Sequence, residues 1–253
     1  MKKGQVAYFM LVALIILISF GFLYYVHDLS MTPYEPTKKT VFEPVNLYIE
    51  ECIKNAAAES LLANSFQGGF YNGTPKAIVN SFSNIPIFSD GNTIMVPGLE
   101  ELEQQLSLSV DNKILRCVKE FKIFENQGFN VNFENPSSNS KIMPDKILFD
   151  INLPVTISKG TIKKHFDRFS FYLTSRYKLV YNVAEKISQL NSQNPTMLCL
   201  SCIIDYGNKN DLRIIATDYD NKTIRFSIID QKVKIGSEEL VFNFMHKLGG
   251  TVA

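Results

Sequence analysis

Four cysteines are the side chains of this sequence best suited to covalent chemistry: Cys52, Cys117, Cys199 and Cys202. Outside the cytoplasm an even number of cysteines predicts disulfide bonds, and four cysteines allow three complete pairings. A Cys-x-x-Cys pair such as Cys199 and Cys202 can also exchange disulfides with a substrate, provided that a helix N-terminus or a positive neighbour stabilises a thiolate. A zinc site built from all four is disfavoured, because Cys52 and Cys117 lack close metal-ligand spacing.

The sequence around each cysteine distinguishes these roles. Cys52 lies on the apolar side of a helix predicted over 45–67, and Cys117 lies on the apolar side of the next predicted helix. We therefore predict a disulfide that joins these two helices, with the other two cysteines as a local pair. The segment MLCLSCII at 197–204 is apolar and typical of a strand, which favours a structural clip at a turn over a redox pair.

Other motifs for catalysis or metal binding are absent from the sequence. It contains neither the H-E-x-x-H motif of zinc proteases nor the G-x-S-x-G turn of serine hydrolases. We expect the three histidines to pack or to contact solvent: His27, His165 and His246. The sequence DYDNK at 218–222 resembles half of a calcium loop but lacks the remaining ligands, and we predict a turn there. We predict no enzyme activity, no cofactor, and no catalytic, cofactor-binding or metal-binding residue.

Two kinds of surface site remain. A local run of basic residues predicts either contact with anionic lipid or glycan, or a solvated loop; it consists of Lys159, Lys163, Lys164, His165 and Arg168. Asn72 and Asn221 each begin an Asn-x-Thr motif for glycosylation, and both lie in predicted loops.

The elements that must position these residues follow from the spacing of apolar side chains. Intervals of three or four residues predict helices over 45–67, 98–121 and 177–190. Alternation of apolar and polar residues predicts strands over 129–133, 147–153 and 169–173, and a hairpin with arms 212–217 and 224–229. The polar segment TISKGTIKKHFDR at 156–168 is expected to connect two of these strands. The order of elements predicts an α+β fold with helices packed on a mostly antiparallel sheet.

An apolar segment comes before the predicted folded region. Residues 6–26, 21 in all, carry no charged side chain and are long enough to span a bilayer as a helix. Lys2 and Lys3 come before it, which predicts a single-pass membrane protein with a cytoplasmic N-terminus and an extracytoplasmic remainder. We predict a signal and transmembrane anchor over 1–28, a proline-containing stalk over 29–45, and an α+β region over 46–253 that is one domain or two subdomains divided near 126–145 or 191–210.

Composition favours a folded exterior without affinity for nucleic acid. Hydrophobic residues make up 45% of the chain and charged residues 20%, which is enough apolar material for a sizeable core. Removing Lys2 and Lys3 from the 26 basic residues leaves 24 against 25 acidic residues, so the exterior has a formal charge of −1. This near-neutral balance gives no support to nucleic-acid binding.

The KKGQ junction at 2–5 and the apolar segment after it resemble the class III signal of archaeal type IV pilins. In that family a membrane peptidase cuts after the glycine and leaves the apolar helix in the mature chain, so the resemblance implies cleavage between Gly4 and Gln5. Pro33 and Pro36 depart from the pilin pattern, because they would stop the first helix soon after the membrane. An uncut anchor is the alternative.

A wider resemblance is to a group of uncharacterised archaeal envelope proteins. It rests on the KGQ start, a cysteine-containing helix that ends in QGG, a second helix that ends in Cys117, and LPVTISKG at 153–160. It implies an anchored external domain without a known activity. We therefore expect an envelope protein with a binding or structural role at the cell surface, in part pilin-like, whose partners are the membrane and a surface polymer, another envelope protein or a second copy. The alternative is a membrane-anchored thiol-disulfide oxidoreductase that uses Cys199 and Cys202.

Overall fold

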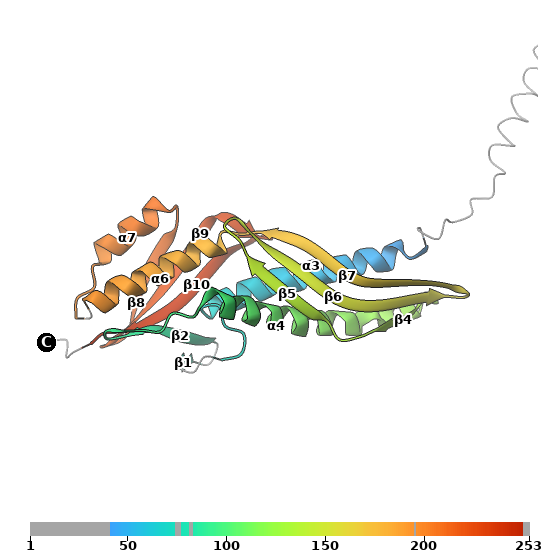
Figure 1. Cartoon of the computed structure of the whole chain (residues 1–253), viewed down its shortest axis with the longest axis horizontal. Helices are drawn as coiled ribbons and strands as arrows, with labels where there is room; N and C mark the ends of the chain where they lie inside the picture. Colours follow the sequence, from blue (N-terminus) through green and yellow to red (C-terminus); the bar gives the residue numbers. More distant parts are fainter. Residues whose placement is uncertain (1–40, 74–76, 81–82, 195, 250–253) are drawn as a thin grey trace, which may run out of the picture. The chain divides into compact units, whose positions relative to one another are not determined.

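The first predicted helix forms where apolar residues recur at intervals of three or four positions. This helix is α3 (Glu43–Phe66), which buries Cys52 on its apolar side. Two glycines end it: Gly68 and Gly69 have φ angles of 63° and 93°, and the Gly69 amide donates to the Asn64 carbonyl at 2.6 Å. The computed structural model describes residues 41–73, 77–80, 83–194 and 196–249, and Figure 1 labels their elements.

The second predicted helix begins directly after Gly98 and is α4 (Leu99–Val118). Its buried apolar residues again recur at intervals of three or four: Leu102, Leu106, Val110, Ile114 and Val118. A 3-10 turn, η1 (Lys119–Phe121), and one short helix, α5 (Lys122–Glu125), continue it. Both helices predicted in this half of the chain are therefore confirmed.

The polar segment 156–168, which the sequence suggested to be a connection, lies inside a long hairpin. β6 (Lys146–Lys159) and β7 (Ile162–Thr174) pair antiparallel along their lengths and turn at Gly160, whose φ is 58°. The prediction was wrong because polar residues can occupy the solvent face of a strand, where they alternate with apolar ones. The segment is thus as polar as a loop, while its backbone is extended on both sides of the turn at Gly160 and Thr161.

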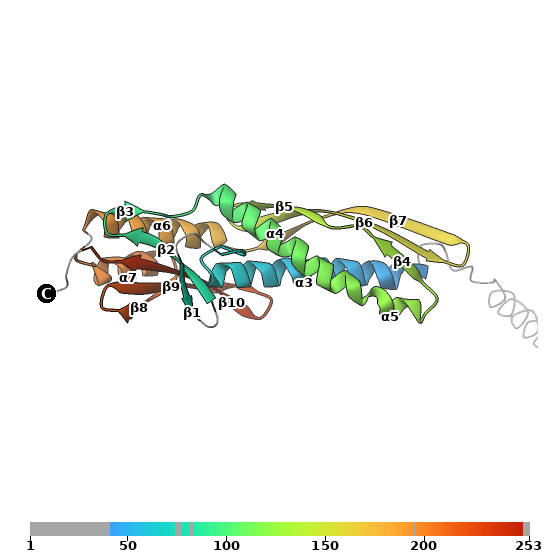
Figure 2. The same ribbon diagram turned by 90° about the horizontal axis from the view of Figure 1, so that it is seen from below.

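Two shorter strands complete this sheet: β4 (Asn130–Phe133) and β5 (Ser137–Ile142). Both pair antiparallel with β6, and because β7 takes the other edge of β6, β7 is an outer strand. Figures 1 and 2 show α3 and α4 running along one face of the sheet. The side chains that β6 buries on this face are Ile147, Phe149, Ile151, Leu153, Val155 and Ile157.

A second sheet combines strands from distant parts of the chain: β1 (Ala77–Asn80), β2 (Ser83–Asp90), β3 (Thr93–Ile94), β8 (Arg213–Asp220), β9 (Thr223–Ile235) and β10 (Glu238–Lys247). Their order is β1-β2-β10-β9-β8, with β3 beside β2. β2 and β10 are parallel, and the remaining pairs are antiparallel. The predicted α+β class with mostly antiparallel pairing is confirmed, in the form of two sheets.

Two helices accompany the second sheet: α6 (Tyr177–Gln193), which was predicted, and α7 (Leu200–Lys209), which was not. α6 packs on β2, β9 and β10, and α7 packs on β8. Four phenylalanine rings of this sheet are fully buried: Phe88, Phe226, Phe242 and Phe244. They form the apolar centre that holds the sheet and α6 together.

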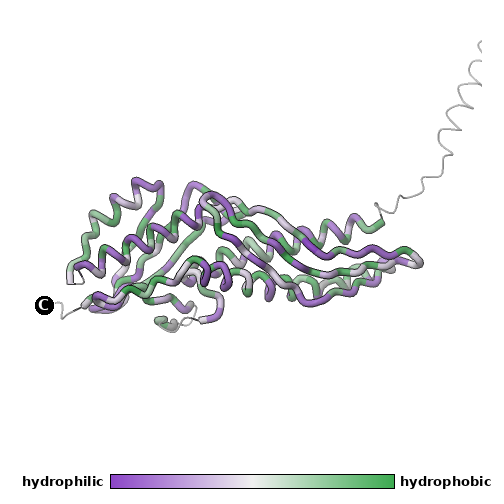
Figure 3. Tube along the Cα trace, viewed as in Figure 1, coloured by the Kyte–Doolittle hydropathy of each residue, from purple (hydrophilic) through white to green (hydrophobic). Residues whose placement is uncertain are grey.

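Residues Pro44–Ala253 form one compact unit, and the subdomain breaks suggested by the sequence stay a prediction. Figure 3 shows hydrophobic and hydrophilic residues interleaved along its helices and strands. Among the described residues, no helix is both long enough and apolar enough to cross a membrane. The anchor predicted over 6–26 lies outside the described residues.

Candidate functional site

The CLSC sequence lies at the start of α7. Cys199 is the N-cap residue of this helix, and its Sγ accepts a hydrogen bond from the Cys202 amide at 3.3 Å. The two cysteines form a disulfide with a Cα–Cα distance of 5.3 Å, and both are exposed. The predicted local pair is therefore present, but the strand-like setting predicted for it is wrong.

The physical reason is that a short apolar run cannot distinguish a strand from a helix by composition alone. Ile203 and Gly207 are buried one turn apart, so this face of α7 is the one that meets β8. The approach is close: a Cβ on Gly207 would lie 2.7 Å from the Ile214 side chain of β8. The interval of four between Ile203 and Gly207 was the available helical signal.

A helix N-terminus changes what this cysteine pair can do. The first amides of a helix have no partner within the helix, and together with the helix dipole they favour a negative charge. A Cys199 thiolate formed by reduction would therefore be stabilised at this position. Since residues 196–204 contain no acidic side chain, no neighbour in the sequence opposes that effect.

Exposed apolar side chains lie close to the disulfide in the sequence. Met197, Leu200 and Ile204 are 76%, 48% and 49% exposed. Ile204 also lines a shallow hollow of about 720 Å³ between α7, β8 and the segment around Lys232. We call these three residues and this hollow the α7 surface. Exposed apolar surface beside a hollow is typical of a contact site for another molecule.

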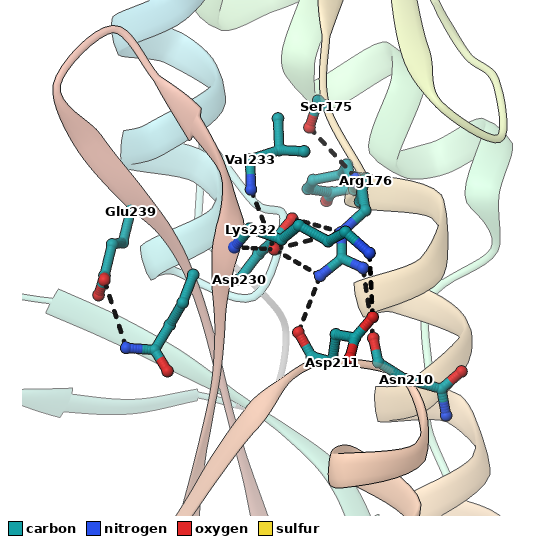
Figure 4. A network of polar contacts seen from close by, with 10 residues as sticks. Ser175, Arg176, Asn210, Asp211, Asp230, Lys232, Val233 and Glu239 are labelled. Carbon is teal, nitrogen blue, oxygen red and sulfur yellow. Dashed lines mark hydrogen bonds and ion pairs between the residues drawn. The ribbon is translucent and has the colours of Figure 1, made fainter.

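An ion pair fixes the segment that follows α7 (Figure 4). Arg176, at the start of α6, contacts the buried Asp230 carboxylate of β9 with its Nη2 at 2.6 Å from Oδ1. The same guanidinium donates to the carbonyls of Asn210 and Asp211, in the turn from α7 to β8. The hydrogen bond to Asp230 raises the pKa of Arg176. These contacts hold the segment that follows α7 in place. Sequence analysis did not identify these residues.

The second disulfide joins Cys52 of α3 to Cys117 of α4, with a Cα–Cα distance of 6.0 Å. This is the pairing predicted from the apolar sides of the two helices. A hollow of about 350 Å³ beside it is lined by apolar side chains and by two acidic and two basic ones, of which Lys113 and Glu59 form an ion pair at 2.9 Å. Acidic and basic groups largely neutralise one another there, so the hollow shows no preference for a ligand of either charge.

The two histidines that the structure describes pack or contact solvent, as expected. His246 is fully buried beside Phe226 and Phe244, and its Nε2 lies 3.0 Å from the Ser188 hydroxyl. Burial lowers the pKa of His246 to about 3. His165 is exposed on β7, and His27 lies outside the described residues. Since Ser188 is fully buried as well, no substrate can reach this serine-histidine pair.

The remaining predicted sites lie apart from α7. Asn72 is exposed after α3, and Asn221 is exposed in the turn between β8 and β9, so both candidate glycosylation asparagines are at the surface. Of the DYDNK sequence, 218–220 end β8 and only Asn221 and Lys222 form that turn, where Asp220 accepts a hydrogen bond from the Lys222 amide at 2.8 Å. The basic run lies on β6 and β7, and Gly4 and Gln5 lie outside the described residues. Within the described part of the chain, no group of three or more His, Cys, Asp or Glu side chains is arranged to hold a metal ion.

Comparison with known proteins gives no family to which this geometry can be assigned. No family model matches the chain, and neither the curated proteins nor the solved structures contain a match.

Proposed function

We propose that this chain is an envelope protein anchored by residues 6–26, with its folded region outside the cytoplasm and a structural or binding role at the cell surface. The observation that carries the proposal is that all four cysteines are in disulfides. Such bonds persist in oxidising compartments and are rare in the cytosol. Lys2 and Lys3 before the apolar segment support the same orientation.

Pilin-like processing is the finer part of this proposal. Cleavage between Gly4 and Gln5 would leave the apolar segment attached to the folded region, as the class III resemblance implies. The mass of the intact membrane-extracted protein tests it. A mature chain that begins at Gln5 supports the proposal, and a chain that still begins at Met1 or Lys2 removes the processing and leaves the anchor.

Protease accessibility tests the orientation. Protease added to intact cells should degrade the folded region, and a cytoplasmic protein detected in the same sample should survive. Protection of the folded region in intact cells, followed by its digestion after lysis, would show that the orientation is reversed.

The exposed Cys199–Cys202 disulfide at a helix N-terminus favours a second candidate function, thiol-disulfide exchange on the α7 surface. A substrate thiolate would attack one sulfur and form a mixed disulfide while the other cysteine leaves as a thiolate. A second substrate thiol would then release the substrate as a disulfide and leave Cys199 and Cys202 reduced. A further disulfide-containing partner would have to oxidise the pair again.

A reduced peptide with two thiols tests this candidate. After incubation with the oxidised protein, mass spectrometry should find the peptide disulfide and, in equal amount, reduced Cys199 and Cys202. The variant with both cysteines changed to serine is the control and should leave the peptide reduced. An unreacted peptide with the unmodified protein would eliminate the exchange activity.

A further inference from the structure

β7 has an open edge. It is the outer strand of its sheet, 13 residues long, and among the described residues only β6 pairs with it. Unpaired amides and carbonyls along such an edge are a template for another strand. A strand edge of this length is either protected against pairing or used for it, and the side chains of β7 indicate that it is used.

The sequence of β7 is self-complementary about the midpoint between Asp167 and Arg168. Residues at equal distances on the two sides form the pairs Asp167–Arg168, Phe166–Phe169, His165–Ser170, Lys164–Phe171, Lys163–Tyr172 and Ile162–Leu173. Five of these pairs combine opposite charges, aromatic rings, a cation with a ring, or two aliphatic groups, the sixth combines His165 with Ser170, and none places like charges opposite each other. Such cross-strand pairs stabilise antiparallel sheets.

The backbone of β7 places the matched side chains of these pairs on the same side of the sheet. In a regular strand neighbouring residues face opposite sides, so a midpoint between two residues would put matched side chains on opposite faces. In β7 the alternation restarts at the midpoint: Phe166 and Phe169 are both half-buried, whereas Asp167 and Arg168 are both exposed. The pairing of β7 with β6 is irregular at the same place. Matched residues therefore face the same side, as antiparallel pairing requires.

We propose that two copies of this chain associate by antiparallel pairing of their β7 edges, with the two-fold axis between Asp167 and Arg168. A two-fold interface brings the same surface of both copies together. Asp167 of each copy then lies opposite Arg168 of the other, and the two sheets become continuous. Within one copy Asp167 contacts His165, while Arg168 has no ion-pair partner among the described residues.

The neighbouring surface of α3 agrees with this axis. A hollow of about 320 Å³ separates α3 from residues 168–171 of β7, and the helix contributes Glu50 and Lys54 to it. Leu47, on the same side of α3, is 56% exposed. The axis brings this side of α3 towards its counterpart, where Glu50 and Lys54, which pair with each other at 3.8 Å within one copy, offer opposite charges. The dimer goes beyond the proposed function and does not rest on it, because the paired surfaces lie in the folded region alone.

Charge reversal tests the axis in the full-length protein extracted in detergent. We expect a dimer by light scattering, and Arg168→Asp or Asp167→Arg alone should weaken it by roughly tenfold or more, because each places two like-charged pairs across the axis. The double variant D167R/R168D restores opposite charges and should restore the dimer. Asp218→Arg, on the outer strand β8, is the matched control and should have no effect. A monomeric unmodified protein, or a double variant as weak as the single ones, would overturn the proposal.

Cysteine cross-linking tests the register. Lys163→Cys and Tyr172→Cys placed in one chain lie nine positions apart on one strand, about 30 Å, so they cannot bond within a copy. In the proposed register they lie opposite each other in two copies, and mild oxidation should give a covalent dimer in high yield. The pair Lys163→Cys with Ser170→Cys is shifted by two positions and should remain monomeric on a non-reducing gel. Equal cross-linking of both pairs, or of neither, contradicts this register.

Discussion

Individual buried groups make the stability of this protein depend on pH. His246 has no contact with solvent, and its pKa is lowered to about 3, whereas an unfolded chain binds a proton on histidine near pH 6.5. The unfolded state therefore takes up a proton that the folded state refuses between these two pH values. The contribution of His246 to the free energy of unfolding is therefore fully present above pH 6.5 and is lost as the pH falls towards 3.

We expect this single histidine to lower the free energy of unfolding by about 3 kcal/mol between pH 7 and pH 4.5. Urea unfolding at several pH values measures the effect. His246→Gln should remove this part of the pH dependence, although it also lowers stability at pH 7. An unchanged pH dependence in His246→Gln would show that other groups cause it.

Removing Arg176 from its pair with Asp230 should destabilise the fold. Asp230 is fully buried, and Arg176 is its only charged partner in the described part of the chain. Arg176→Met leaves the carboxylate buried without its cation, and we expect a loss of about 3 to 5 kcal/mol. The double variant R176M/D230N removes the charge as well and should regain part of that loss. Denaturant unfolding measures both variants, and equal stability of the two would mean that the charge is not what matters.

At the scale of elements, the two disulfides differ in how much chain they enclose. Cys52 and Cys117 are 65 positions apart, whereas Cys199 and Cys202 are only three apart. In the chain-entropy model a bond that closes about 65 residues stabilises a fold by roughly 4 kcal/mol, and a bond that closes three residues contributes much less. The first disulfide therefore joins α3 to α4 with a large effect on stability.

Replacing both Cys52 and Cys117 by alanine should consequently lower the melting temperature far more than replacing both Cys199 and Cys202. Calorimetry or circular dichroism of the two double variants checks the order. Peptide mapping without reduction must accompany it, to show that each variant keeps its other disulfide. Equal melting temperatures would mean that α3 and α4 are held together by packing alone.

The helices and strands also show which parts of the fold can be predicted from the sequence and which cannot. The helices α3, α4 and α6 and the hairpin of β8 and β9 have strong periodicity, and they form close to the predicted positions. The predictions for α7 and for the segment 156–168 were wrong, because a short apolar run fits a strand as well as a helix, and a polar strand has the composition of a loop. The Arg176–Asp230 contact joins residues 54 positions apart. Only the folded chain reveals it, because nothing in the local sequence marks either partner.

For the whole molecule, the position of each strand in its sheet predicts how often its backbone opens. β10 has strands on both sides, β9 and β2, whereas β8 is at the outside of the same sheet. Amides in the centre of a sheet exchange with solvent only when large parts of the fold open. Hydrogen exchange measured by mass spectrometry should therefore be slowest in β10 and clearly faster in β8. Comparable rates in both strands would contradict the strand order.

The parallel pair of β2 and β10 also constrains how the molecule is made. Ile87 of β2 pairs with Met245 of β10, so most of the folded chain separates the two partners in sequence. Contacts of this kind form late, because a long loop must close before they stabilise anything. During synthesis β2 leaves the ribosome well before its partner exists, while β6 and β7 can pair as soon as their own turn is made. Until β10 has been translated, β2 can pair only with its neighbours β1 and β3, and its apolar residues Ile85 and Ile87 lack Met245, against which they are buried in the folded chain. A chaperone that shields extended segments would therefore find its target at Ser83–Asp90.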